Sequence, residues 1–135
     1  GDPAPPVAAY RQYLAGVFGF SAHSADAGGE VTPAATTGRE DEAAQRVLRF
    51  TEAQLVWDRA MAEAIASARG RHPDGLVVAI AGRGHVEHRW GIPNQLADLG
   101  TPGALVLLPV EEADVCVMDG DLADAVFVLP RNVEE

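Results

Sequence analysis

The sequence predicts an α/β protein, with a small central sheet of three or four mostly parallel strands packed by a long amphipathic helix and shorter helices. Residues 39–69 contain neither Pro nor Gly and place apolar side chains at helical spacing, which indicates one long helix. After it, apolar runs at 76–81 and 104–108 flank a short helical segment at 92–100. Strand, short helix, strand is typical of a parallel sheet, so we expect the two runs to be parallel neighbours.

Length and composition fit one domain with one core. The chain has 135 residues, 47% of them hydrophobic, which is enough for a single folded unit over residues 1–135. Its 20 acidic and 10 basic residues give a net charge of −10, which argues against nucleic acid and anionic membrane surfaces as partners. The single cysteine, Cys116, excludes an intrachain disulfide and a cysteine-based zinc site.

The first third of the chain is predicted to be a short helix followed by a loop. The proline-rich residues 1–6 are expected to be a linker, and any export signal would lie upstream of them. Helical spacing predicts a helix over 7–20, and the small and polar residues of 24–38 predict a flexible loop. His23, at the start of this loop, is a candidate ligand, although an exposed loop histidine is the simpler interpretation.

Two polar residues interrupt the apolar face of the long helix. At about 100° per residue, apolar side chains that include Phe50, Trp57 and Met61 fall within one half of the helix surface. Gln54 and Asp58, one turn apart, project into the same half. A buried carboxylate needs a hydrogen-bonding or charged partner, so Asp58 belongs either to a structural pair or to the wall of a site. The stripe with Trp57 and Met61 is expected to be core.

The sheet is expected to continue towards the C-terminus. The run at 76–81 is the first predicted strand and 104–108 the second. A minor strand is predicted at 115–118, and a third strand at 124–129 could run in either direction.

The first predicted strand leads into a glycine-flanked polar turn that contains Arg83, His85, Glu87, His88 and Arg89. Ligands tend to collect beyond the carboxyl ends of strands in open α/β sheets, so a site is expected here. The basic side chains would suit a small anionic ligand rather than a polyanion. The alternative is a polar turn that merely ends a core strand.

The histidine spacing alone is weak evidence for a metal site. On a helical turn, His85 and His88 could face one ion, whereas in an extended stretch they would point to opposite faces. The flanking glycines argue against a regular helix. Neither a nucleophile elbow nor a phosphate-binding glycine fingerprint is present. The chemical feature left after these exclusions is a histidine at a strand end, beside arginines that can pair with carboxylates.

Three segments are informative in combination. Residues 53–62 carry an Ala-Gln pair followed by Asp-x-x-Met-Ala, residues 78–86 are an apolar run ending in Gly-x-Gly-His-Val, and residues 91–93 are Gly-Ile-Pro. In order and content they resemble the ChaN-like haem-binding lipoproteins of the TraB/Tiki superfamily, and the resemblance extends over residues 7–109. Family members usually have an N-terminal half with an early strand and a Gly-Glu-x-His segment. Because this chain has neither, we expect it to correspond to the C-terminal part of such a protein.

The resemblance implies an α/β fold and haem binding in iron acquisition outside the cytoplasm. The protein would be a lipoprotein whose membrane anchor lies upstream of this chain, and the haem would often be held across a homodimer. His85 is the residue that carries over as principal site and metal-binding residue, and Gln54 and Asp58 accompany it as motif residues. His23 is similar to a histidine that precedes the long helix in the family.

Haem needs an apolar slot, an axial ligand and cations for its propionates. Several side chains could fill these roles. Trp57, Phe50 and Met61 could wall the slot, His85 or His23 could bind the iron, and Arg83 and Arg89 could meet the propionates. Tyr10 and Tyr13 are further iron ligands that no motif singles out.

We therefore expect a haem-binding protein rather than an enzyme, with two alternatives left open. One is a metal-dependent hydrolase, since the wider superfamily includes proteases, with His85, Glu87 and His88 activating water on a metal. The other is a non-catalytic interaction module in which the polar helix residues only fix packing. The haem hypothesis makes a spatial prediction: His85 should lie close to Asp58 or Gln54, at the end of residues 76–81.

Overall fold

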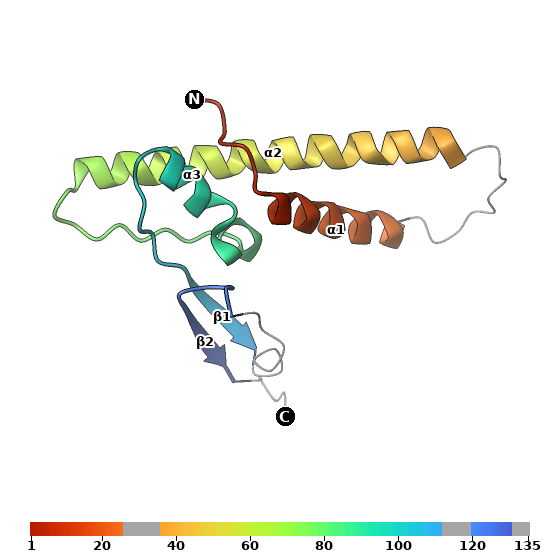
Figure 1. Ribbon diagram of the computed structural model, residues 1–135. Coiled ribbons are helices and arrows are strands. Elements are labelled where there is room, and N and C mark those ends of the chain that lie inside the picture. Colours follow the sequence, from red (N-terminus) through yellow and green to blue (C-terminus); the bar gives the residue numbers. More distant parts are fainter. Residues whose placement is uncertain (26–35, 112–119, 131–135) are drawn as a thin grey trace.

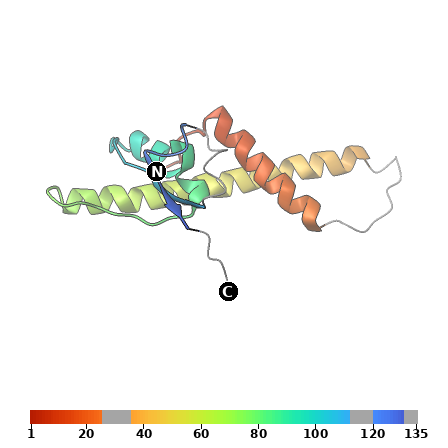
Figure 2. The same cartoon turned by 90° about the horizontal axis from the view of Figure 1, so that it is seen from below.

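The structure, a computed structural model, describes residues 1–25, 36–111 and 120–130. Its elements are α1 (Ala8–Ala25), α2 (Thr36–Arg71), the 3-10 turns η2 (Arg83–His85) and η3 (Glu87–Arg89), α3 (Ile92–Asp98), β1 (Leu107–Glu111) and β2 (Ala125–Leu129). The long helix α2 runs across the molecule, α1 lies beside one half of it, and α3 lies near the other half (Figure 1). Seen from below, α1 crosses α2 obliquely (Figure 2).

The helices lie close to the ranges predicted from the sequence. α2 extends the predicted 39–69 by a few residues at each end, and Arg69 and Arg71 lie in its last turn, where cations favour the helix dipole. α1 continues to Ala25, beyond the predicted end at residue 20. The predicted loop at 24–38 therefore overlaps both helix ends, and its middle, 26–35, lies outside the described residues. α3 confirms the short helix predicted from Ile92, with Pro93 in its first turn.

The sheet has two described strands rather than three or four. β1 and β2 are parallel, in a register that pairs Leu107 with Ala125 and Glu111 with Leu129. Alternate β1 residues, Leu108 and Val110, are buried, so one face of this strand contributes to the core. The second predicted strand thus begins later than expected, and the third, whose direction the sequence left open, runs parallel to it. The minor strand predicted at 115–118 lies outside the described residues.

The prediction that 76–81 is a paired strand next to 104–108 is wrong for the described part of the chain. Residues 76–82 are extended but belong to no sheet, and β1 pairs with β2 instead. Leu76 is 91% exposed and Ile80 98% exposed. The apolar run indicated burial on both faces, but no described strand lies beside it to provide that burial.

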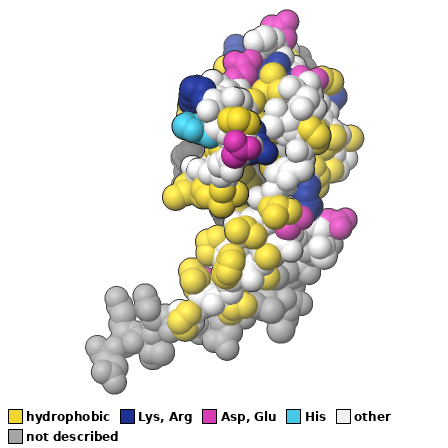
Figure 3. Space-filling model, turned by 90° about the vertical axis from the view of Figure 1, so that its left-hand side faces the viewer, with side chains coloured by type: hydrophobic (Ala, Val, Ile, Leu, Met, Phe, Trp, Pro, Cys, Tyr) yellow, Lys and Arg dark blue, Asp and Glu magenta, His cyan; other side chains and the backbone are white. Residues whose placement is uncertain are grey.

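Two small buried clusters hold the fold together. One joins α2 to α3 through Ala62, Ile92 and Leu96. The other lies behind the sheet and comprises Val106, Leu108 and Leu122. Val86, between η2 and η3, packs against both clusters. Hydrophobic side chains also gather on the surface, over the lower part of the molecule where the strands lie (Figure 3).

None of the helices in the described ranges is long and apolar enough to cross a membrane. The N-terminal residues are held against the helices rather than free of them. The backbone of Ala4 forms two hydrogen bonds with the buried side-chain amide of Gln95: the Ala4 N–H donates to Oε1 at 2.8 Å, and Nε2 donates to the Ala4 carbonyl at 3.0 Å. The N-terminal amine lies 2.8 Å from Oε1 of Glu63. These contacts fix the position of the chain just before α1 begins.

Candidate functional site

The polar turn after residue 82 is compact and tightly bent. His88 and Arg89 have φ of 53° and 60°, in the left-handed region that non-glycine residues seldom adopt. Gly91 then passes close to α2. A Cβ at this position would lie 2.5 Å from the carbonyl oxygen of His85 and 3.0 Å from both carboxylate oxygens of Asp58. The close approach requires glycine, and it brings the turn and α2 together.

Asp58 and His85 form the centre of the site. Asp58 is fully buried, and its Oδ1 lies 2.7 Å from Nδ1 of His85. Its other oxygen, Oδ2, accepts a 2.8 Å hydrogen bond from the hydroxyl of Tyr10, which is itself buried. The predicted proximity of His85 to Asp58 is confirmed, although residues 76–81 lead to the site without forming a strand.

Burial dominates the electrostatics of this group. Desolvation raises the pKa of Asp58, and the hydrogen bonds from Tyr10 and His85 offset part of that rise. The pKa of Tyr10 is raised far above its ordinary value, because its ring is buried and its hydroxyl donates to the Asp58 carboxylate. The hydroxyl therefore stays protonated and remains a donor to Asp58.

A second polar group lies beside the first. Glu87 is buried, and its Oε2 accepts a 2.7 Å hydrogen bond from Nε of Arg83. Tyr13 also hydrogen-bonds to Glu87; its pKa is raised to about 12, first by burial and then by that hydrogen bond. The Tyr13 hydroxyl lies near Gly84, where an added Cβ would be 3.1 Å away. Each buried carboxylate thus has a tyrosine from α1 and a partner from the turn.

Aromatic rings cover one side of this arrangement. Tyr10 and Tyr13 stack at 6.3 Å between ring centroids, and Trp90 lies 6.3 Å from the first and 6.0 Å from the second. The ring of His88 stacks on Trp90 at 4.2 Å. His88 is therefore packed against Trp90, and its backbone N–H donates to Leu122, near the sheet.

The second arginine of the turn ties it to the sheet. Arg89 forms an ion pair with Asp124. The other oxygen of Asp124 accepts a 2.7 Å hydrogen bond from the backbone N–H of Val106, and this bond is the main reason that the pKa of Asp124 is lowered. Both arginines of the turn, Arg83 and Arg89, are therefore engaged with carboxylates of this chain.

Several predicted site residues are not brought to this centre. Trp57 is 60% exposed on α2, so the expectation that it belongs to the core is wrong in the described structure. Gln54 is half-buried and makes no hydrogen bond to His85 or Asp58 among the described residues. His23 lies in α1, but its side chain is outside what the structure describes.

The metal-site geometry of the hydrolase alternative is also missing from the described ranges. Glu87 is bonded to Arg83, and His88 is stacked on Trp90. Among the residues whose side chains the structure describes, no group of three or more His, Cys, Asp or Glu could hold a metal ion. The prominence of these residues in the sequence reflects ion pairing and stacking.

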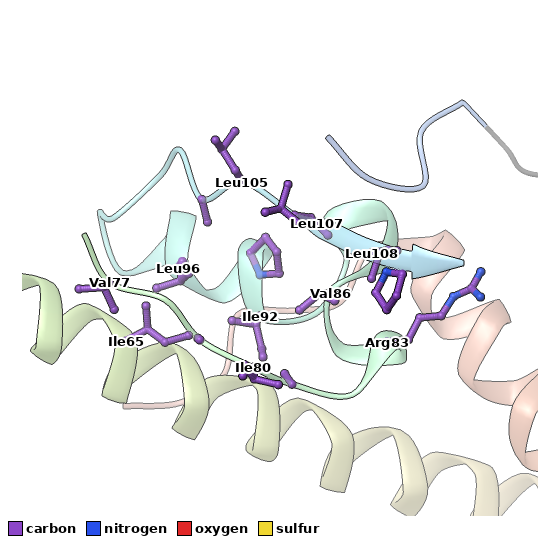
Figure 4. A pocket seen from close by; sticks show the side chains of 16 residues that line it. Ile65, Val77, Ile80, Arg83, Val86, Ile92, Leu96, Leu105, Leu107 and Leu108 are labelled. Carbon is purple, nitrogen blue, oxygen red and sulfur yellow. The ribbon is translucent and has the colours of Figure 1, made fainter. Parts of the chain in front are cut away.

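An apolar pocket of about 390 Å³ lies next to the turn. The pocket lies between residues 105–108 on one side and the segment with Val77 and Ile80 on the other (Figure 4). The other labelled side chains come from α2, the turn and α3: Ile65, Arg83, Val86, Ile92 and Leu96. Arg83 is the one charged residue that lines it. His85 does not line the pocket, but its chain neighbours Arg83 and Val86 do.

A sequence profile described as "Haem-binding uptake, Tiki superfamily, ChaN" matches residues 2–96. The chain belongs to this ChaN family. The match includes Tyr10, Asp58, His85 and Gly91, and it ends before the two strands, so it is shorter at its C-terminal end than the predicted resemblance over residues 7–109. No match was found among curated proteins or among solved structures.

For this ChaN family member, sequence reasoning missed the importance of the two tyrosines. Tyr10 and Tyr13 were noted only as available iron ligands, yet each hydrogen-bonds a buried carboxylate. Their spacing of three on a predicted helix places both on one face, and a buried tyrosine hydroxyl needs a partner. That signal could have pointed to Asp58 as the missing acceptor.

Proposed function

We propose that this chain binds haem and that Nε2 of His85 is the principal iron ligand. The observation that carries the proposal is the pairing of His85 Nδ1 with the buried Asp58 in a chain that belongs to a haem-binding family. Nε2 of His85 makes no hydrogen bond within the described residues. An imidazole held at one nitrogen and open at the other is the arrangement that metal-binding histidines use.

Two features of the neighbouring pocket support the proposal, its apolar lining and one cation, although His85 itself does not line it. The neighbouring pocket is mostly apolar, and its volume of about 390 Å³ falls in the ~300–1,000 Å³ range of small-molecule sites. Arg83 lines the pocket and is half-exposed, so it could meet a propionate while keeping its contact with Glu87. Bound haem would supply an iron centre for capture and transfer, and the chain would supply the ligand nitrogen, apolar walls and a cation.

The proposal extends to the cellular role. Membership of a haem-binding uptake family supports a part in iron acquisition, and we place that role outside the cytoplasm, with a lipid anchor upstream of this chain. A homodimer is the partner arrangement to test, because apolar side chains such as Leu76 and Trp57 are exposed. The metal-dependent hydrolase and the non-catalytic interaction module are the two alternatives.

Haemin titration of the chain tests the function directly. We expect a saturable shift of the Soret band in the wild type. His85→Ala removes the ligand nitrogen, so its apparent affinity should fall by about tenfold or more, which is about 1.4 kcal/mol.

His88→Ala is the matched control. It deletes an imidazole three residues away that is stacked on Trp90, and it should leave the titration unchanged. A wild-type chain without a saturable shift would refute haem binding, and equal loss in both variants would refute the role of His85. Peptidase activity restored by zinc or manganese after chelation would instead support the hydrolase, and silence in both assays would leave the interaction module.

A further inference from the structure

A groove lies between two extended segments of the chain. Residues 77–81 line one side of it and residues 104–109 line the other, and the two segments run in the same direction (Figure 4). The space between them is the apolar pocket of about 390 Å³ beside the polar turn. We refer to this pocket as the groove, because two strand-like segments form its walls.

The edge of β1 that faces away from β2 has unused hydrogen-bonding groups. Val106 directs both of its backbone groups towards β2, because its N–H donates to the carboxylate of Asp124 and its carbonyl accepts from two N–H groups of the same segment. Successive residues of a strand direct their backbone groups to opposite edges, so Leu105 and Leu107 direct theirs away from β2. Pro109 lacks an N–H at that same edge, and free edges are where sheets tolerate proline.

The groove runs along this free edge of β1. Every residue from 104 to 109 lines it, although successive side chains of a strand point to opposite faces, and none of the described residues 120–130 does. A cavity over one face of the strand would be lined by alternate residues only. A polypeptide in the groove would therefore meet the free backbone groups of Leu105 and Leu107.

The opposite wall of the groove is a second unpaired segment. The backbone groups of residues 76–81 make no hydrogen bond to any other described residue. The segment is an unbroken apolar run, which is typical of a strand in a parallel sheet that is covered on both faces, yet Leu76, Val78 and Ile80 are exposed. An exposed apolar strand with unpaired backbone groups is a template for pairing with another chain.

Arg83 gives one end of the groove a positive charge. It is the one charged residue that lines the groove, and it follows residues 77–81 at their carboxyl end. Its Nε is bonded to Glu87, whereas its Nη groups make no hydrogen bond within the described part of the chain, and its side chain is half-exposed. The guanidinium can therefore bind a further carboxylate at this end without releasing Glu87.

We propose that the groove is a docking site for an extended apolar segment of another polypeptide, which lies parallel to β1 and places an acidic residue beside Arg83. A polypeptide fits because its backbone can pair with the free groups of both walls, while its apolar side chains fill the space between them. The docked strand would join residues 76–81 to β1 and β2 in one parallel sheet. Because both walls run towards Arg83, a parallel strand brings its carboxyl end to this residue.

This proposal does not rest on haem binding. Haem would use the same apolar walls, so a docked strand and haem would exclude one another. Experiments on docking are therefore made without haemin.

A synthetic peptide tests the docking directly. The probe is Val-Ile-Val-Ala-Val-Asp with an amidated C-terminus, and it carries fluorescein on a polyethylene glycol spacer at its N-terminus. Fluorescence anisotropy should show saturable binding to the chain. The same peptide with N-methyl groups on alternate residues should bind about tenfold more weakly or worse, because it loses backbone hydrogen bonds. No saturable binding, or equal binding of both peptides, overturns the proposal.

A pair of matched variants locates the peptide. Ala79→Asp puts a carboxylate in the wall of the groove, where the docked strand would leave it without solvent, so the affinity should fall by about tenfold or more. Ala60→Asp makes the same change at an exposed position of α2 that does not line the groove, and it should leave binding unchanged. Equal effects of the two variants would place the peptide elsewhere. Circular dichroism checks that both variants are folded.

The contact with Arg83 is measured by a double-mutant cycle. Arg83→Gln should weaken binding of the probe by about two- to fivefold, the range of a partly exposed ion pair. A probe with Asn in place of Asp should lose as much against the wild type, and the two changes together should cost no more than either alone. Losses that multiply would overturn the predicted position of the acidic residue.

Hydrogen exchange distinguishes strand pairing from contact with a sheet face. On binding of the probe, the amides of Leu105 and Leu107 should become protected, because they gain acceptors. The Val106 amide, which already donates to Asp124, should change little. A bound peptide that leaves Leu105 and Leu107 unprotected would lie on a face of β1, and pairing with its free edge would be wrong.

Two further results would change the occupant or separate this proposal from haem binding. If sedimentation shows that the wild type is a dimer and that Ala79→Asp is a monomer, a second copy of the chain fills the groove and the proposal is wrong. If the probe binds and haemin does not, the docking site stands and the proposed function fails. If haemin binds and the probe does not, docking alone is overturned.

Discussion

The two tyrosines of this chain place their hydroxyls against two buried carboxylates. Tyr10 donates to Asp58, and Tyr13 hydrogen-bonds to Glu87. A negative charge on either phenol would face a carboxylate in a poorly solvated environment. Both hydroxyls are therefore held in their protonated form, which keeps the hydrogen bonds to α2 and to the turn intact.

Alkaline pH should remove the stabilisation that the two tyrosine hydroxyls provide. The folded-state pKa of Tyr13 is about 12, against an ordinary value of 10.0, and that of Tyr10 is raised further. A pKa raised on folding means that the unfolded chain loses its proton first, so stability is complete below pH 10 and falls as the pH rises from 10 towards 12. These are the only two tyrosines in the sequence, so tyrosinate absorbance reports on them alone.

In the native chain we expect no tyrosinate signal near pH 10, and a first component near 12 that Tyr13→Phe removes. In denaturant both rings should ionise near 10. If half of the native signal appeared near pH 10, Tyr13 would be solvated and its contact with Glu87 would be absent.

At the residue scale, the sequence predicted the contact of Asp58 with His85 but not its contact with Tyr10. Asp58 was identifiable because a carboxylate on an apolar helix face needs a partner, and His85 was identifiable from its glycine-flanked turn. Tyr10 was not, because it lies 48 residues from Asp58 and helical spacing alone does not distinguish a buried tyrosine from an apolar core residue. Trp57 shows the converse, since helical spacing could not reveal that its face of α2 is uncovered.

Among the elements, the extended segment before the site differs most from its prediction. Residues 76–82 carry strand-forming side chains, but they have no sheet partner in the described structure. Strand propensity reports how well a residue fits a half-buried pleated surface, and no described strand lies beside this segment to create such a surface. Helices were predicted well for the complementary reason, because their backbone hydrogen bonds lie within the segment.

Substitutions on this segment test whether it is unpaired. Ile80 is 98% exposed, so Ile80→Ser should change the free energy of unfolding by no more than about 0.5 kcal/mol. Leu96, in the buried cluster between α2 and α3, is the comparison, and Leu96→Ala should cost roughly 2–5 kcal/mol. Urea denaturation measures both. A cost above about 1 kcal/mol for Ile80→Ser would show that residues 76–81 are buried in solution.

The molecule as a whole consists of a helical part and a small sheet that meet at the polar turn. The buried cluster of each part is small, and the turn connects them through Val86, the ion pair between Arg89 and Asp124, and the backbone bond from His88 to Leu122. The sequence predicted both parts, but it could not show how they meet. That contact depends on residues about 35 positions apart, such as Arg89 and Asp124.

Val86 should therefore be a residue on which the cooperativity of unfolding depends. It packs against the α2–α3 cluster and against the cluster behind the sheet. Val86→Ala removes two partly buried methyl groups, so we expect a loss of roughly 1–2 kcal/mol. Because the substitution weakens both contacts at once, the sheet should lose its protection before the helices do.

Hydrogen exchange measured residue by residue would reveal this order. In Val86→Ala the amides of β1 and β2 should exchange faster while those in the middle of α2 change little. Val78→Ala is the matched control, because it removes the same two methyl groups from a side chain that is 75% exposed, and it should leave both regions unchanged. A uniform increase across α2 and the sheet in Val86→Ala would mean that the chain unfolds as one cooperative unit, with no separable boundary at the turn that carries His85.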